Sequence, residues 1–450
     1  MGNYYARFGG RRMEQGPQGY LASRLPYSAG PYHNVLALFF FHDFAYKEIA
    51  AIGKKERLMA QHTVGRTDTF RPFVSPSLHS VLILRLTCGL VALLGALISF
   101  FGTSWDIQWH VLLGRDRTLI LPHEMMLAGI AIDGIVALAV IVTETIWSRR
   151  YQGIAQQAPL FAGLLAGPLG AYIVGYAALN AAIAFPLDTY WHTLYGIDVS
   201  IWAPFHIMII SGMALMAFGA VYMLASAAHL AMHLRKRRAK RSAYAGMIGA
   251  FAASLSLFTL LVAEGIGLEN SVSLGFVSFN LFPVLSTLLL GCMLGGAVYA
   301  LPGKWVATSI VGVSLFFVFI DQVAIPPALN WLMQIEQLTY RAGHSHSLPI
   351  VLVAVKWPLL SLVSAFLIDL CMQRARQRGW SERRLFIGIA LAAFVGGVPL
   401  DLASPRAALS LVHGLGVLGT LLSIAIGCLG CVIGTTLGRN IGSTTRALER

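Results

Sequence analysis

Charged residues are scarce in this chain: Asp, Glu, Lys and Arg together make up 12% of its 450 residues. The sequence contains no Walker loop, dinucleotide fingerprint, HExxH motif or nucleophile elbow, which argues against ATP-driven transport. The five cysteines lie in apolar segments, so we expect no disulfide framework. Cys428 and Cys431 have CxxC spacing, but inside a hydrophobic helix we interpret them as small packing residues.

Hydrophobic residues, in contrast, are abundant. Hydrophobic residues make up 56% of it, and the mean hydropathy is +0.68. Several uncharged runs exceed the roughly 20 residues that cross a bilayer as a helix. The sequence therefore predicts an all-α fold, a polytopic transmembrane helix bundle of about ten spans. The predicted spans lie near residues 80–102, 119–146, 158–185, 200–233, 243–267, 278–301, 305–321, 348–371, 384–401 and 408–436.

Short polar connections join these spans, which predicts one bundle without a separate soluble domain. We expect residues 1–79 to be a basic, partly disordered cytoplasmic extension, residues 80–436 the bundle, and residues 437–450 a cytoplasmic tail. When alternate connections are counted, 27 of the 33 Lys and Arg fall on one side. The positive-inside rule then predicts a multi-pass cell-membrane protein with both termini in the cytoplasm. It also accounts for the net charge of +13 without a nucleic-acid partner.

Ionisable side chains gather on the opposite, outer side. The stretch "WDIQWHVLLGRDRTLILPH" (105–123) contains Asp106, His110 and His123 in the pattern Asp-x3-His-x12-His. Asp106 and His110 are four residues apart, which places them on one face of a helix. Pro122 suits the first turn of the helix that follows, at which His123 lies. The pattern predicts that the three side chains meet at an outer turn.

A second copy of this pattern follows 82 residues later, in "DTYWHTLYGIDVSIWAPFH" (188–206). Asp188, His192 and His206 have the spacing Asp-x3-His-x13-His. Both copies follow an outward-running span and precede an inward-running one, so the repeat has parallel topology. Internal repeats in membrane proteins commonly bring their equivalent sites together.

One carboxylate and two imidazoles form a three-ligand set for a divalent transition metal, with open positions for water, oxygen or substrate. We therefore predict metal binding by each triad. Imidazole suits copper, zinc, iron and nickel alike, so the ligand types leave the metal open. The simpler alternative is a set of interfacial groups, because Trp is expected in the aromatic belt and a single His near a membrane surface is often only solvated.

The two motifs resemble those of the C subunit of the copper membrane monooxygenase family, which includes particulate methane monooxygenase and ammonia monooxygenase. That subunit carries Asp-x3-His-x12-His followed by Asn-x3-His-x13-His, and this chain has both spacings in the same order. Asp188 stands where the family has Asn. The resemblance implies copper as the metal, oxygen and a small apolar substrate as reactants, and other membrane subunits as partners.

Three further histidines are candidates on the outer side. His344 and His346 form an HxH pair in "RAGHSHSLP", and His413 lies in "SLVHG". On the inner side, His229 and His233 are four residues apart and would also suit a metal. Because "LRKRRAKR" follows them, we favour a helix C-terminus with cations that face anionic lipid.

The sequence leaves three functions open. The first is an integral membrane metal-binding protein that acts as a copper-dependent oxidase or monooxygenase relative, with zinc or iron as alternatives to copper. The second is a multi-span transporter or permease that uses the Asp/His pairs to bind a cation or a proton. The third is a scaffold in which the Asp/His pairs are structural.

Overall fold

The fold is mainly helical in the part of the chain that the computed structural model describes, which comprises residues 76–113, 119–161, 163–196, 200–265, 271–340, 352–397 and 405–447. Two short hairpins, β1–β2 and β3–β4, lie in connections between helices. The helices are α2 (Leu78–Leu112), α3 (Leu121–Arg150), α4 (Gln152–Ala155), α5 (Leu169–Tyr195), α6 (Pro204–His233), α7 (Arg237–Glu264), α8 (Phe282–Ala300), α9 (Val306–Ile335), α10 (Leu352–Arg378), α11 (Glu382–Gly397) and α12 (Pro405–Ala447). The strands are β1 (Leu160–Phe161), β2 (Leu165–Ala166), β3 (Val272–Ser273) and β4 (Ser278–Phe279).

Eight of these helices are long and apolar enough to cross a membrane: α2, α3, α5, α6, α7, α8, α9 and the greater part of α12. The prediction of an all-α helical membrane bundle is confirmed at this level. Each of the ten predicted spans overlaps one helix, but α10 and α11 are not among the eight. The full count of ten spans and the cytoplasmic placement of the termini therefore stay predictions.

Four helices differ clearly from their predicted bounds. Helices α2 and α9 continue to Leu112 and Ile335, beyond the predicted ends at residues 102 and 321, and α5 and α12 also differ. The predicted span 158–185 begins too early, because β1 and β2 pair as a hairpin there and α5 starts only after Pro168. Proline cannot donate a backbone hydrogen bond and restricts the residue before it, so it favours a helix start. At the other end of the chain, α12 continues through most of the predicted tail (437–450) to Ala447, with a break in helical geometry at Gly416.

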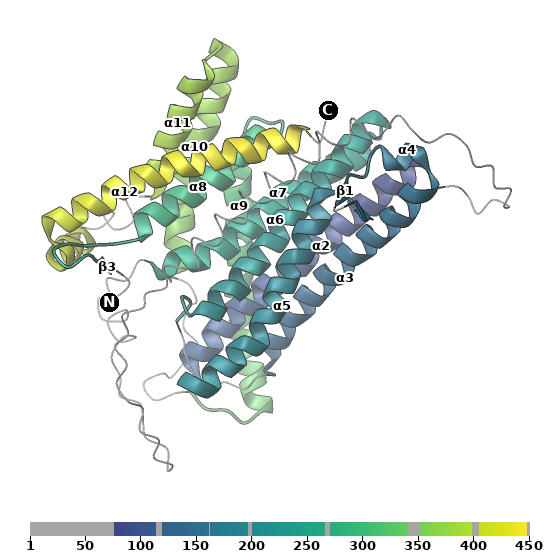
Figure 1. Cartoon of the computed structure of the whole chain (residues 1–450). Coiled ribbons are helices and arrows are strands. Elements are labelled where there is room, and N and C mark those ends of the chain that lie inside the picture. The colour runs from purple at the N-terminus through teal and green to yellow at the C-terminus, as the bar shows by residue number, and fades with distance from the viewer. Residues whose placement is uncertain are drawn as a thin grey trace. The chain divides into compact units, whose positions relative to one another are not determined.

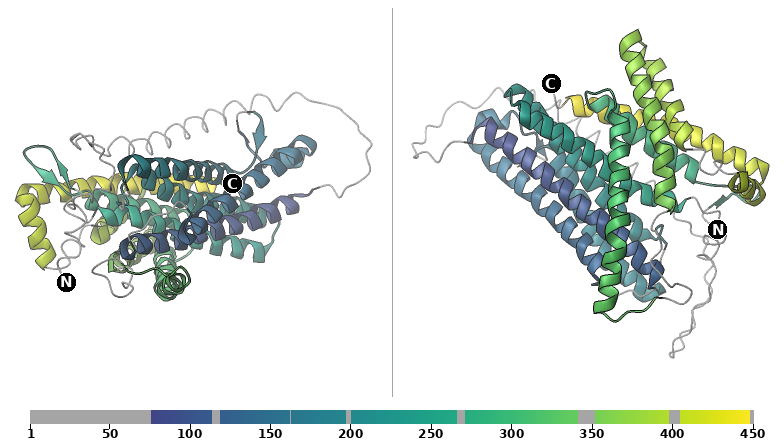
Figure 2. Two further views of the ribbon diagram at one scale, coloured as in Figure 1. Left: turned by 90° about the horizontal axis from the view of Figure 1, so that it is seen from below. Right: turned by 180° about the vertical axis from the view of Figure 1, so that it is seen from behind.

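Four helices that carry the repeated motifs form a ring in which α2 contacts α3, α3 contacts α5, α5 contacts α6, and α6 contacts α2 (Figure 1). The views from below and from behind show the same helices side by side (Figure 2). In the repeat, α2 corresponds to α5 and α3 corresponds to α6. The contact of α2 with α6 therefore corresponds to the contact of α5 with α3. The repeat therefore has approximate twofold symmetry, and it brings the ends of α2 and α5 to the same end of the ring.

Small residues let these helices approach closely. Helix α6 is rich in Ala, Gly, Ser and Met, and it is buried along most of its length among α2, α5 and α7. A helix that is apolar on all sides is expected inside a bundle. Gly170 of α5 faces Gly219 of α6 so closely that a Cβ on Gly170 would lie 2.5 Å from the Gly219 carbonyl oxygen. This is the small-residue packing that membrane helices use, because lipid offers no hydrophobic drive for association.

Helix α12 packs along α8 in the same way. Gly434 and Gly438 lie one turn apart on the face of α12 that meets α8. A Cβ on Gly434 would lie 2.4 Å from the Leu288 carbonyl oxygen, and one on Gly438 would lie 2.5 Å from that of Gly291. Only glycine fits at such distances, so the two backbones pack directly against each other.

A buried ion pair joins α2 to α3 at the end of the ring opposite the motifs. Arg85 Nε donates to Glu144 Oε1 at 2.7 Å, and Arg85 Nη2 donates to Glu144 Oε2 at 2.7 Å. The same Nη2 donates to the Gln157 backbone carbonyl at 2.8 Å. Both side chains are almost fully buried, at 4% and 0% exposed. The bidentate hydrogen bonds neutralise both charges, because an unpaired charge buried here would carry a large desolvation cost.

We expect Arg85→Met or Glu144→Met alone to lower the free energy of unfolding by about 3–5 kcal/mol, because each leaves one buried charge unpaired. The double variant Arg85→Met, Glu144→Met should recover most of that loss. Unfolding of the purified protein in detergent measures all three. A double variant as unstable as the sum of the two single variants would contradict this account of the pair.

Candidate metal centre

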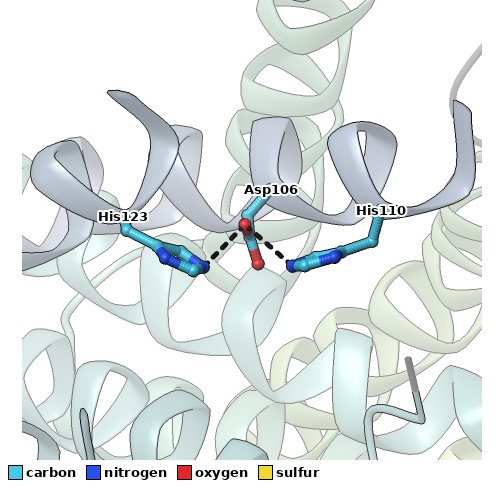
Figure 3. Close-up of side chains that lie close together, drawn as sticks. All are labelled: Asp106, His110 and His123. Carbon is cyan, nitrogen blue, oxygen red and sulfur yellow. Dashed lines mark ion pairs between the residues drawn. The ribbon is translucent and has the colours of Figure 1, made fainter. Parts of the chain in front are cut away.

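The first triad lies where α2 ends and α3 begins. Asp106 and His110 occupy the last two turns of α2, one turn apart, and His123 follows Pro122 in the first turn of α3. The connection between the helices reverses the chain and brings His123 back to the end of α2. Figure 3 shows the Asp106 carboxylate between the two imidazole rings.

Distances within this triad suit a shared ion. The Nε2 atoms of His110 and His123 lie 3.4 and 3.0 Å from Asp106 Oδ1. A metal held at about 2.0–2.2 Å from each ligand in tetrahedral geometry separates its ligand atoms by roughly 3.4 Å. Asp106 Oδ1 is buried between the two ring nitrogens. The three atoms are therefore close enough to share one ion.

The second triad repeats this arrangement between α5 and α6. Asp188 and His192 lie one turn apart near the end of α5, and His206 lies in the first turn of α6. His192 Nε2 is 3.2 Å from Asp188 Oδ2, and His206 Nε2 is 3.5 Å from Asp188 Oδ1. Asp188 Oδ1 is buried as well. In each triad one ligand atom per residue can be chosen so that all three lie within 4.8 Å of one another.

Backbone carbonyls orient both imidazoles of the second triad. His206 Nδ1 lies 2.7 Å from the Ser200 carbonyl oxygen, and His192 Nδ1 lies 3.2 Å from that of Gly196. A carbonyl can only accept, so each Nδ1 carries a proton, and Nε2 is the ring nitrogen that faces the carboxylate. This is the arrangement in which protein imidazoles bind metals. Gly196 has φ +86°, a conformation that glycine adopts at little cost.

The loop that supplies the Ser200 carbonyl is itself held by α7. Ser200 Oγ donates to Glu264 Oε1 at 3.2 Å, and Trp202 Nε1 donates to the Leu261 carbonyl at 2.8 Å. The Trp202 backbone N–H donates to Ser200 Oγ at 3.2 Å. These bonds explain how a connection between helices can hold His206 in one orientation.

The two triads are neighbours. The ring of Phe185, one turn before Asp188, packs edge-on against His123 of the first triad at 6.0 Å between centroids. Asp106 of the first triad acts electrostatically on His206 of the second. In the repeat, Thr103 takes the place of Phe185, one turn before Asp106. The sites are therefore adjacent but differ in the bulk of the residue beside them.

Two methionine sulfurs lie just below the triads, inside the ring. Thr103 Oγ1 is 3.1 Å from Met126 Sδ and 3.7 Å from Met213 Sδ, and all three residues are buried. Met126 is one turn from His123, and Met213 is two turns from His206. The two methionines therefore belong to the buried core of the ring, on the helices that carry His123 and His206.

The additional histidines that the sequence suggested as metal ligands are not found in either triad. His413 is exposed on α12 and belongs to neither triad. His344 and His346 lie outside the described residues. Phe185 and the two carbonyls of Gly196 and Ser200 were missed by the sequence analysis. The position of Phe185, three residues before Asp188, is the one signal that could have placed it on the same helix face.

A separate buried carboxyl lies near the middle of α3. Asp133 is fully buried, and neither of its oxygens has a hydrogen-bond partner among the described residues. Gly95 of α2 leaves the space for it, since a Cβ there would lie 2.3 Å from Asp133 Oδ1. An ionisable group at this depth is a candidate functional residue, because it is costly to keep without a partner.

Comparison with known proteins found no match for this chain among protein-family models, curated proteins or solved structures. The two triads and their surroundings are therefore the observations on which a function can be based.

We expect the purified chain to retain a transition metal, and His110→Ala combined with His192→Ala to lose most of it, because each change removes one of three ligands. His413→Ala is the matched control, since it removes an exposed histidine outside both triads. Elemental analysis of protein purified without chelator gives the metal content per chain. An unchanged metal content in the double variant would exclude the triads as the site.

Proposed function

We propose that this chain is a copper-binding membrane protein that takes part in the oxidation of a small apolar substrate by oxygen. In this proposal it is a distant relative of the C subunit of the copper membrane monooxygenases. The triads face the outer side of the cell membrane, and both termini lie in the cytoplasm. Other membrane subunits are expected to complete the enzyme.

The observation that carries this proposal is the pair of triads with matching geometry. Two independent spacings, in order, bring one carboxylate and two imidazoles together twice, with nitrogen-to-oxygen distances of 3.0–3.5 Å. Copper is proposed over zinc and iron because the two spacings resemble the copper motifs of that family.

In this proposal the groups around the triads orient the imidazoles and shield them from water, and the metal supplies the redox chemistry. Bound copper would supply the redox chemistry with oxygen. The carbonyls of Gly196 and Ser200 keep His192 and His206 in the metal-binding tautomer. Phe185 packs on His123 and keeps water from that ring, while lipid supplies an apolar substrate from the side.

Electron paramagnetic resonance of the copper-loaded protein tests the metal. We expect a Cu(II) signal with hyperfine splitting from histidine nitrogen in the wild type and in His413→Ala, and its loss in the His110→Ala, His192→Ala double variant. Protein that takes up no copper, or that shows no nitrogen splitting, would overturn the proposal. This readout needs no partner subunit and no substrate.

A transporter or permease is the second candidate function, and Asp133 is the observation that favours it. A buried carboxyl that has no hydrogen-bond partner among the described residues, near the middle of a membrane helix, suits the passage of a cation or a proton. Ion flux into proteoliposomes that is abolished by Asp133→Asn, while the metal content stays unchanged, would support transport. Wild-type protein that binds copper but gives no flux would favour the oxidation proposal.

A further inference from the structure

A groove of about 470 Å³ opens at the end of the bundle opposite the triads. It lies between the first turns of α2 and the turn that joins α6 to α7. Leu82, Ile83 and Leu86 of α2 form its apolar side. Ile83 is 51% exposed, so this side of α2 is open rather than packed against another described helix.

The other side of the groove is strongly basic. Residues 235–238 are Arg, Lys, Arg and Arg, all four are exposed, and all four line the groove together with His79. No acidic residue lines it, and none of the ion pairs in the described part of the chain involves these cations. Four positive charges beside an apolar surface complement a ligand that has an anionic head and an apolar tail.

The start of α7 also supplies backbone N–H donors to the groove. Helix α7 begins at Arg237 and has no side-chain cap. Its first backbone hydrogen bond inside the helix joins the Lys240 N–H to the Lys236 carbonyl at 3.0 Å, so the N–H groups of residues 237–239 have no partner within the helix. Free N–H groups and the positive end of the helix dipole favour a phosphate group. These three residues all line the groove.

Arg235 holds an unusual backbone conformation at this turn. Its φ is +54°, in the left-handed region, and the Lys236 N–H closes the turn on the Ala231 carbonyl at 2.8 Å. Glycine is the residue that such a helix end normally carries, because a side chain is strained there. An arginine at this position places a charge at the groove where glycine would have relieved the strain.

We propose that this groove binds one anionic phospholipid, with its phosphate at the start of α7 and an acyl chain along Ile83 and Leu86. Membrane proteins bind acidic lipids through basic pockets at helix ends on the positively charged side. The groove lies at helix ends of three candidate membrane spans, α2, α6 and α7, which is the depth of lipid headgroups. The chain's own residues 1–75 are a poor alternative occupant, because they carry ten Lys or Arg against five Asp or Glu.

Native mass spectrometry of the detergent-purified full chain tests the proposal. We expect phosphatidylglycerol to remain bound where phosphatidylcholine does not. The variant Arg235→Gln, Arg237→Gln, Arg238→Gln should weaken phosphatidylglycerol binding by about tenfold or more, since each cation near an anionic lipid adds to the attraction. The matched control is Arg374→Gln, Arg378→Gln, Arg383→Gln, which removes three exposed cations outside the groove and should leave binding unchanged.

A second variant separates a lipid from a free phosphate. Ile83→Trp fills the apolar side and keeps every charge, so it should weaken phosphatidylglycerol binding, and excess inorganic phosphate should not displace the lipid. Equal loss in the control variant, or equal binding of phosphatidylcholine, would overturn the proposal. Displacement by inorganic phosphate together with no effect of Ile83→Trp would identify a simple anion site instead and would also overturn it.

Discussion

The absence of water around the membrane helices is the constraint on which the rest of this structure depends. A charge placed among apolar side chains has no solvent to stabilise it, so it needs a partner from elsewhere in the bundle. Arg85 meets this requirement with a bidentate bond to Glu144. Asp106 and Asp188 are each placed between two imidazoles. Neither oxygen of Asp133 has a hydrogen-bond partner among the described residues, so this buried carboxyl needs a functional explanation.

Close helix packing makes these partnerships geometrically feasible. Contacts such as Gly170 with Gly219 leave little space between backbones, so side chains from neighbouring helices reach a common point at the ends of the ring. The approximate twofold symmetry of α2, α3, α5 and α6 then places two triads side by side. The symmetry is broken locally by Phe185 on one side and Thr103 on the other. Two sites with the same ligands can therefore differ in polarity and in the room that they leave for a substrate.

The two ends of the bundle differ in chemistry. One end gathers carboxylates, imidazoles and aromatic rings around two candidate metal sites. The other end has the Arg85–Glu144 pair inside and a basic, apolar groove outside. In the proposed reading, chemistry at the outer end and lipid binding at the inner end are independent properties of one scaffold. A lipid in the groove would contact α2, whose far end carries Asp106 and His110, and it would help to hold this helix in place.

The sequence by itself determined the helical membrane class, because long uncharged runs have no other stable arrangement in lipid. It also determined which residues belong to the triads, since the spacing of Asp106 and His110 and the repeat 82 residues later are properties of the chain. The tertiary structure alone decided the rest. It separated His413 from the triads, moved the start of α5 beyond a hairpin, and paired Arg85 with Glu144. It also brought Phe185 against His123 and the Ser200 carbonyl to His206. These contacts join different helices or depend on the path of a loop. They could not be predicted from the sequence, because residue spacing along the chain does not specify how helices pack or how a loop runs.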